Sequence, residues 1–211
     1  MPRLRIDPAG LPFVGAALAL ALLSGAAVAW VLALPFVALA AFFLFFFRDP
    51  ERRITGGLDA VLAPADGRVL VAGAADAAAA PPGEWKQISI FLSPMNVHVN
   101  RVPVTGRVTR VGYTPGRFLP AYHHDAAAAN ERSEIWIDHD GQMVVARQIV
   151  GILARRVVCR LQTGAEVRGG DRYGIMKFGS RMDVFLPVTA EILVQAGQAV
   201  RGGETVIAML H

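Results

Sequence analysis

The chain has 211 residues, a formal net charge of +4 and a hydrophobic share of 54%, which is high for a soluble domain. The basic excess comes without a Lys/Arg run or interleaved aromatic and basic residues, which argues against nucleic acid as a partner. The only cysteine is Cys159, so a disulfide framework and a cysteine-rich zinc cluster are excluded. We expect Cys159 to be a small core residue.

The hydrophobic excess lies in an uncharged run from Pro8 to Phe47. As a single helix, these 40 residues would extend ~60 Å, about twice the ~30 Å core of a bilayer. The run therefore fits two spans, and it is too long for the apolar region of a cleaved signal peptide. A single tilted span and a segment lying in the membrane interface are the alternatives.

Both flanks of the run are basic, and basic flanks stay in the cytoplasm. We therefore predict that residues 1–47 form a membrane-anchoring helical hairpin, which turns between Ser24 and Pro35. Residues 48–211 would form a catalytic domain on the cytoplasmic face of the cell membrane, where a modest basic charge attracts anionic lipids. The flanking arginines are Arg3 and Arg5 before the run, and Arg48, Arg52 and Arg53 after it.

Beyond the run, short stretches rich in Val and Ile alternate with Gly, Pro and Asp. This pattern predicts a mainly β fold, a sandwich or barrel with at most short helices. The Ala/Pro-rich segment Ala74–Pro82 is expected to be a surface loop. The expected strands are Arg68–Ala72, Gln87–Leu92, Gly106–Tyr113, Glu134–Asp138, Met143–Ile149, Arg156–Leu161, Arg181–Leu186, Glu191–Leu193 and Thr205–Leu210.

A motif, G-x-x-V-R-G-G-[DE], occurs twice, at residues 164–171 and 197–204. Together with residues 63–69, it resembles the hammerhead hairpins of biotinyl and lipoyl carrier domains and of sugar-phosphotransferase domains. The resemblance implies such hairpins in the fold. It also implies a rival function, a membrane-anchored carrier domain modified on Lys177. Against the carrier, Phe-Gly-Ser follows Lys177, where biotin carriers usually have Met or a small residue.

Gly179-Ser180 lies between two stretches that indicate strands, and this bond is suited to self-cleavage. Glycine adds no bulk beside its carbonyl and permits strained backbone angles. The Ser180 hydroxyl lies within reach of that carbonyl. An N-to-O acyl shift followed by β-elimination would cut the chain and leave a pyruvoyl group at residue 180. The alternative is a turn serine that caps a local N–H.

Four blocks occur in a fixed order: Ala63–Val69, Phe91–Pro103, Asn130–Arg132 and Phe178–Ser180. In this order they resemble the phosphatidylserine decarboxylase proenzymes of the short bacterial and archaeal type, over residues 48–211. The resemblance implies self-cleavage at 179/180 into a β chain (1–179) and an α chain (180–211), which remain together as a heterodimer. It also implies conversion of phosphatidylserine to phosphatidylethanolamine through a Schiff base on the pyruvoyl group, with no metal. A homo-oligomer is left open.

Within these blocks, His98 shares a strand face with Asn96 and Asn100, and histidine is a natural proton carrier near neutral pH. Longer relatives carry a second histidine three residues on, which activates the serine. This chain has Arg101 there. His98 therefore serves both cleavage and decarboxylation, or another group takes the first role.

The resemblance also implies that Asp66 orients the base, although Asp in an Asp-Gly pair commonly bonds its own turn. Asn130, Arg132 and Phe178 are expected to bind the substrate headgroup or order the loop, with Arg132 suited to a carboxylate or phosphate. His123, His124 and Asp125 suggest a metal, but we expect them to be exposed loop residues. A third hypothesis is a noncatalytic membrane-anchored β-domain that leaves the Gly179-Ser180 bond intact.

Overall fold

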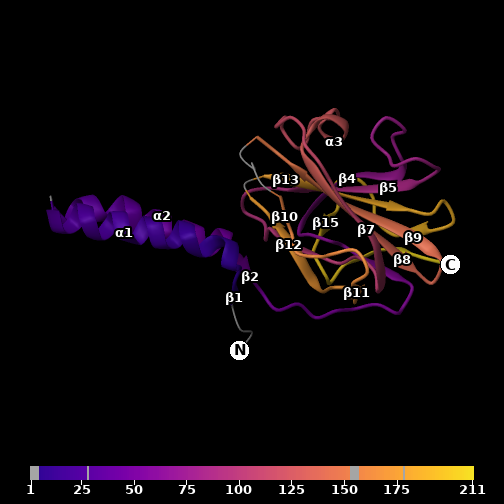
Figure 1. The fold of residues 1–211 in the computed structure, drawn as a ribbon, viewed down its shortest axis with the longest axis horizontal. Coiled ribbons are helices and arrows are strands. Elements are labelled where there is room, and N and C mark those ends of the chain that lie inside the picture. Colours follow the sequence, from indigo (N-terminus) through magenta and orange to yellow (C-terminus); the bar gives the residue numbers. More distant parts are fainter. Residues whose placement is uncertain (1–4, 28, 153–156, 178) are drawn as a thin grey trace. The chain divides into compact units, whose positions relative to one another are not determined.

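The computed structural model describes residues 5–27, 29–152, 157–177 and 179–211, and it divides into two compact units (Figure 1). The first unit extends to Glu51, and the second comprises Arg52–His211. This division lies four residues beyond the expected boundary after residue 47.

The first unit is an apolar helical hairpin, as predicted. Helix α1 (Leu11–Ala27) follows a 3-10 turn at Pro8–Gly10, and α2 (Leu34–Phe46) follows another at Trp30–Ala33. The ring of Phe13, near the start of α1, lies 5.4 Å from that of Phe43 and 5.5 Å from that of Phe47, at the end of α2. The helices are therefore antiparallel, and their ends are joined by β1 (Arg5–Ile6) pairing with β2 (Arg48–Asp49).

The lengths of the two helices differ. The stretch Pro8–Ala27 is long and apolar enough to cross a membrane, whereas the second apolar stretch, Trp30–Phe46, is shorter. Proline stands at the start of α2, where its missing N–H costs no helical hydrogen bond.

The second unit is mainly β, which confirms the predicted fold class. Its largest sheet has eight antiparallel strands in the order β11-β7-β8-β9-β13-β5-β4-β15, and it curls (Figure 1). Two three-stranded sheets, β10-β12-β6 and β14-β16-β3, complete it. Residues 75–80 form no strand or helix, as expected for the Ala/Pro segment. The elements are β3 (Ala60–Leu62), β4 (Gly67–Ala74), β5 (Lys86–Leu92), β6 (Val99–Arg101), β7 (Gly106–Thr114), α3 (Ala126–Ala129), β8 (Arg132–His139), β9 (Gln142–Val150), β10 (Val157–Cys159), β11 (Glu166–Val167), β12 (Arg172–Met176), β13 (Ser180–Leu186), β14 (Glu191–Ile192), β15 (Ala199–Val200) and β16 (Val206–Met209).

Strand β13 lies near the middle of the large sheet, between β5 and β9, and is buried along its whole length. Because side chains alternate along a strand, Met182, Val184 and Leu186 point into the main apolar core, while Arg181 and Asp183 point to the other face. Cys159 packs against the core from β10, and burial raises the pKa of its thiol.

The large sheet consists of two matching halves, and the repeated motif forms the outer turn of each. On one side, the turn at 164–165 bonds to β7; on the other, the turn at 197–198 bonds to β4. The matching pairs are Gly164 N–H to Val108 carbonyl (2.7 Å) and Val108 N–H to Ala165 carbonyl (2.8 Å), and Gly197 N–H to Val69 carbonyl (2.8 Å) and Val69 N–H to Gln198 carbonyl (2.9 Å).

The two chain segments that precede β4 and β7 are joined to each other by a matching pair of backbone hydrogen bonds. Leu62 N–H donates to the Pro103 carbonyl, and Arg101 N–H donates to the Pro64 carbonyl, each at 2.8 Å. Residues 62–67 therefore correspond to residues 101–106. This correspondence identifies the matching residue for each side chain near Asp66.

Candidate active site around Ser180

Ser180 is the first residue of β13 and is completely buried. Its Cα partners are Leu92 on β5 and Val150 on β9, and its side chain shares the core face with Met182. Among the described residues, the Ser180 hydroxyl has no hydrogen-bond partner. A buried hydroxyl without a partner costs about 1–3 kcal/mol, and such atoms are uncommon away from functional sites.

Two glycines determine the surroundings of the Gly179 carbonyl: Gly179 itself and Gly151. Gly179 has φ 73°, in the left-handed region, although a Cβ there would meet no atom within 4 Å. Across the sheet, a Cβ on Gly151 would lie 2.3 Å from the Gly179 carbonyl oxygen and 3.2 Å from its carbonyl carbon. Gly179 is therefore required for conformation and Gly151 for space.

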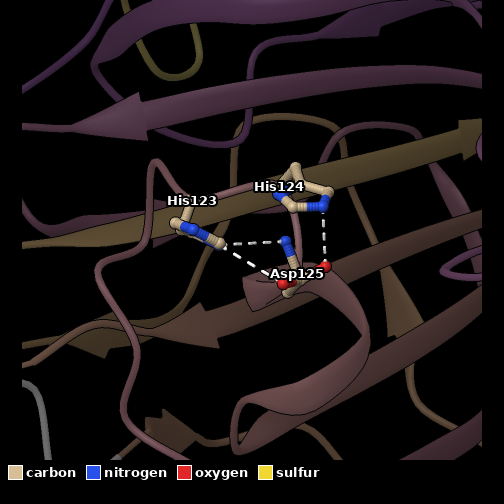
Figure 2. A group of neighbouring side chains, drawn as sticks. All are labelled: His123, His124 and Asp125. Carbon is tan, nitrogen blue, oxygen red and sulfur yellow. Dashed lines mark hydrogen bonds and ion pairs between the residues drawn. The ribbon is translucent and has the colours of Figure 1, made fainter.

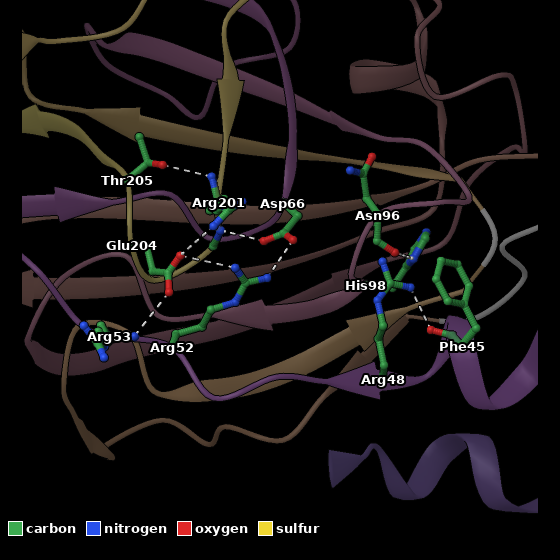
Figure 3. Close-up of polar contacts among 11 residues, drawn as sticks. Phe45, Arg48, Arg52, Arg53, Asp66, Asn96, His98, Arg201, Glu204 and Thr205 are labelled. Carbon is green, nitrogen blue, oxygen red and sulfur yellow. Dashed lines mark hydrogen bonds and ion pairs between the residues drawn. The ribbon is translucent and has the colours of Figure 1, made fainter. Parts of the chain in front are cut away.

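His98 is completely buried, immediately before β6. Its backbone carbonyl accepts a hydrogen bond from the Met176 N–H (3.3 Å), at the end of the strand that leads to Gly179. Its Nδ1 lies 3.0 Å from the Asn96 carbonyl oxygen (Figure 3). A carbonyl only accepts, so Nδ1 carries a proton and Nε2 is the basic nitrogen of the neutral ring.

Two buried amides extend the polar environment on this side of the sheet. Gln148 Nε2 donates to Asn100 Oδ1 at 2.8 Å, which joins β9 to β6. Both residues are almost fully buried, and within the described part of the chain neither Asn100 Nδ2 nor Gln148 Oε1 has a partner. Gln148 precedes Val150 by two residues, so it shares the core face with Ser180.

An apolar pocket of about 360 Å³ adjoins Gly179. Phe91 and Tyr122 contribute ring walls, with ring centroids 5.9 Å apart and nearly perpendicular planes. Gly179 itself contributes to the lining of this pocket. It is lined by Phe91, Pro94, Pro120, Ala121, Tyr122, Ile152 and Gly179.

Asn130 ties the pocket loop to the sheet. Its Oδ1 accepts from the Leu119 N–H (2.9 Å), and its Nδ2 donates to the carbonyls of Leu119 (2.8 Å) and Val150 (2.9 Å). The buried side chain thus uses both amide hydrogens and its oxygen on backbone groups. This geometry favours the loop-ordering role over direct contact with a headgroup.

Asp66 lies in a different polar cluster (Figure 3). Its Oδ2 accepts from Arg52 Nη2 at 2.7 Å, and its Oδ1 accepts from the Gly202 N–H at 2.8 Å. Arg52 also pairs with Glu204, at 3.4 Å. The cluster therefore joins the start of the second unit to the turn at 201–205.

The matching half of the sheet explains one of these bonds. Thr105 corresponds to Asp66, and its hydroxyl accepts from the Gly169 N–H at 3.0 Å, as Asp66 accepts from Gly202. An oxygen acceptor at this position therefore caps the repeated turn, whatever the chemistry of the site.

Arg101, at the place of the second histidine, donates from Nη1 to the Gly170 carbonyl (2.9 Å). A guanidinium stays protonated and cannot act as a base.

The strand register across β8, β9 and β13 has no irregularity, so it determines the sheet face on which Arg132 lies. Its Cα partner is Ile149, whose partner on β13 is Arg181, so Arg132 lies on the opposite sheet face from the Ser180 side chain. Arg132 donates from Nη1 to the Ala128 carbonyl at 2.8 Å. Phe178 lies outside the described residues.

His123, His124 and Asp125 are all exposed, as expected for a loop (Figure 2). Asp125 carboxylate oxygens lie 2.8 Å from His124 Nε2 and 3.6 Å from His123 Nδ1. The three groups could approach one ion, but they are consecutive, open to solvent and supported by no further ligand in the described residues.

Lys177 is half-buried directly after β12, unlike the protruding lysine that a carrier would present for modification.

The structure thus brings His98 close in the fold to the strand end that leads into Gly179-Ser180, and it leaves Asp66 in a separate cluster. Sequence reasoning missed Gly151, Gln148 and the pocket. Gly151 carried a weak signal, since it lies two residues beyond a predicted strand. The pocket had no local signal, because its walls come from four separate segments.

Comparisons with known proteins show the family of this chain. The family model described as Phosphatidylserine decarboxylase matches residues 39–208. A phosphatidylserine decarboxylase proenzyme of Prosthecochloris aestuarii is 47% identical over 172 residues, covering 80% of this chain and 77% of the relative. Proenzymes of the same name from Nitrosomonas europaea (43% identity, 96% of this chain, 94% of the relative) and Desulfotalea psychrophila (38%, 99% and 98%) match nearly end to end.

These matches first define the class: the chain is a decarboxylase, made as a proenzyme. More particularly, it belongs to the phosphatidylserine decarboxylase family, since the family model and the three relatives each cover most of the chain. The resemblance in the four sequence blocks is thereby confirmed.

Proposed function

We propose that this chain cleaves itself at Gly179-Ser180 and then decarboxylates phosphatidylserine to phosphatidylethanolamine with a pyruvoyl group derived from Ser180. The observation that carries the proposal is the buried, unpartnered Ser180 hydroxyl directly after a glycine in the left-handed region. Membership of the decarboxylase family supplies the reaction and the substrate class.

Self-cleavage starts when the Ser180 hydroxyl attacks the Gly179 carbonyl carbon and gives its proton to a base. The Gly179-Ser180 C–N bond breaks, the freed amine takes up a proton, and an ester joins the two residues. Loss of the Ser180 Cα proton then expels the Gly179 carboxylate. The dehydroalanine left at residue 180 tautomerises, takes up water and releases ammonia, which leaves the pyruvoyl group.

The surroundings of residue 180 fit such a group. It is small and uncharged, the site is buried, and Gly151 leaves room beside the adjoining carbonyl. The ladders to β5 and β9 would hold residue 180 in place after the cut. When present, the group supplies an electrophilic carbonyl for the substrate amine and a sink for the electron pair released with CO₂.

His98 is the residue that we assign to proton transfer. Its protonated Nδ1 is fixed on the Asn96 carbonyl, which leaves Nε2 to take up or deliver a proton. The hydrogen bond of its backbone carbonyl to Met176, four residues before Ser180 in the chain, supports this assignment. We infer that it returns a proton to the substrate carbon after CO₂ leaves. Gln148 and Asn100 would orient polar groups of the substrate in this buried environment.

The proposed location is the cytoplasmic face of the cell membrane. The apolar hairpin supports anchoring, and its basic flanks support cytoplasmic ends. Phosphatidylserine and other anionic lipids are the proposed partners, and the two cleaved chains would stay together as a heterodimer.

The test compares purified wild type with Ser180→Ala in vesicles that contain phosphatidylserine. We expect wild type to be cut and to release CO₂, and the variant to remain uncut and inactive. Mass analysis of Lys177 tests the carrier alternative in the same samples. Cleavage of Ser180→Ala at 179/180 would rule out serine as the nucleophile, and a modified Lys177 in an uncut wild-type chain would favour the carrier.

A further inference from the structure

Four exposed apolar side chains lie on the chain segments that line the pocket beside Gly179. They are exposed to 64% (Met95), 40% (Phe118), 65% (Tyr122) and 56% (Ile152), and they come from three separate chain segments. Tyr122 and Ile152 line the pocket itself, whereas Met95 and Phe118 stand next to or near lining prolines. We call these four residues the apolar rim.

The apolar rim is held by a defined framework. Asn130 joins the loop of Phe118 and Tyr122 to the end of β9, two residues before Ile152. Tyr122 also packs on Phe91. On the segment of Met95, the Asn96 carboxamide oxygen accepts from the Ser93 N–H (2.9 Å) and hydroxyl (2.8 Å). The exposure of these side chains is therefore built into the fold.

We propose that the apolar rim docks the second unit on the surface of the lipid bilayer, so that the pocket beside Gly179 opens into the lipid. This inference rests on the proposed function. A two-chain phospholipid must bring its headgroup to residue 180 while its acyl chains stay in an apolar phase. A pocket lined almost entirely by apolar side chains, with the apolar rim on the same chain segments, provides that continuity.

Two further features favour the bilayer over a protein partner. Arg117, the neighbour of Phe118, is exposed and offers a cation to lipid phosphates. A second copy of the chain seated on the apolar rim would cover the pocket that the lipid has to enter. The bilayer is therefore the occupant that leaves the site usable.

The test places a nitroxide label on the full-length protein in lipid nanodiscs, in a Cys159→Ala background. The labelled positions are Met95→Cys and Phe118→Cys. Val188→Cys is the control, because Val188 is 48% exposed but lies beyond the other end of β13 from Ser180. We expect the labels at 95 and 118 to be relaxed strongly by oxygen and weakly by a water-soluble nickel complex, and the label at 188 to show the reverse.

Two results would overturn the proposal. One is equal access of the nickel complex to all three labels. The other is shielding at 95 and 118 with dipolar broadening that disappears on dilution with unlabelled protein, which would indicate a second copy. Neither measurement depends on turnover, so a protein with no decarboxylase activity would contradict the proposed function and leave this test intact.

A second experiment measures the kinetics of the double variant Met95→Ser/Phe118→Ser, with Val188→Ser as its matched control. We expect at least a fivefold loss of kcat/KM on long-chain phosphatidylserine in vesicles. Turnover of a short-chain, monomeric phosphatidylserine should change less than twofold, because the pocket lining is untouched. An equal loss on both substrates would contradict docking.

Discussion

The Gly179 carbonyl is confined by Gly151, and this contact leads to a prediction at the scale of single residues. Gly151→Ala would place a methyl group 2.3 Å from the carbonyl oxygen, so the scissile bond must shift. We expect self-cleavage to slow at least tenfold and the free energy of unfolding to fall by about 1–3 kcal/mol. Gels of cleavage against time, with urea unfolding, measure both effects.

Gly57→Ala is the matched control, since its added Cβ would meet nothing within 4 Å. It should cleave like wild type. Wild-type cleavage in Gly151→Ala as well would show that the carbonyl is free to move.

Asp66 gives a second prediction at this scale. Asp66→Asn keeps an acceptor for the Gly202 N–H but loses the charge partner of Arg52. Both side chains are largely buried, so we expect a loss of about 1–3 kcal/mol in unfolding free energy. Self-cleavage should stay within threefold of wild type, because Arg101 replaces the histidine that this acid would orient. A hundredfold slower cleavage at unchanged stability would assign Asp66 to the chemistry.

The sequence predicts roles for Ser180, Gly179 and His98 because their chemistry can be recognised in short motifs. It could not separate the two possible roles of Asp66, since both use the same Asp-Gly turn. The distinction came from Thr105, which makes the same bond in the matching half without any carboxylate. Gln148 was missed because only the packing of two different sheets brings β9 next to the β6 amide of Asn100.

At the scale of elements, β13 must keep its place after its N-terminal bond is cut. On the face opposite Ser180, Arg181 Nε donates to Asp183 Oδ1 at 2.7 Å, and Arg181 Nη2 donates to the Ser89 hydroxyl at 2.8 Å. Gln87 Nε2 reaches Asp183 Oδ2 at 3.1 Å. This buried network joins β13 to β5 immediately after the cleavage site.

Asp183→Asn tests that network. It leaves the buried Arg181 charge without its carboxylate, which costs about 3–5 kcal/mol when no other group compensates. We expect the 180–211 chain of the cleaved protein to separate from its partner at a lower urea concentration, measured by size-exclusion chromatography. Asp140→Asn, on an exposed turn, is the control. Equal midpoints would show that the backbone ladders alone hold β13.

The sequence predicted most strands of the large sheet, because long Val/Ile runs bounded by turn residues mark them clearly. In the second unit it missed β3, β11, β12 and β15. Three of these have only two or three residues. Such short strands carry no periodicity of their own, and pairing with distant segments defines them. The hairpin was predictable because the absence of charge over a long run is a strong signal.

At the scale of the whole molecule, we expect the two units to have different functions, with the first anchoring the protein and the second carrying the chemistry. We predict that high-salt washing leaves the protein on the membrane and that detergent releases it, because the hairpin buries far more apolar surface than a peripheral electrostatic contact. Fractionation with an antibody to the second unit measures this. Complete release by salt would contradict an inserted hairpin.

A protein that begins at Arg52 provides the complementary prediction. The second unit contains its own apolar core and every residue assigned to chemistry, so we expect it to fold and cleave itself. Its turnover of phosphatidylserine in vesicles should fall at least tenfold for want of the anchor, while its cleavage rate stays near wild type. Failure to cleave in a folded protein would mean that the first unit contributes to the site.

The most direct test of the central claim is the intact mass of the purified wild-type protein. Self-cleavage at Gly179-Ser180 predicts two masses, for residues 1–179 and for residues 180–211. The smaller chain should be lighter by one ammonia than its unmodified sequence and should react with a carbonyl reagent. A single mass for the uncut 211-residue chain in a protein that decarboxylates phosphatidylserine would contradict the account.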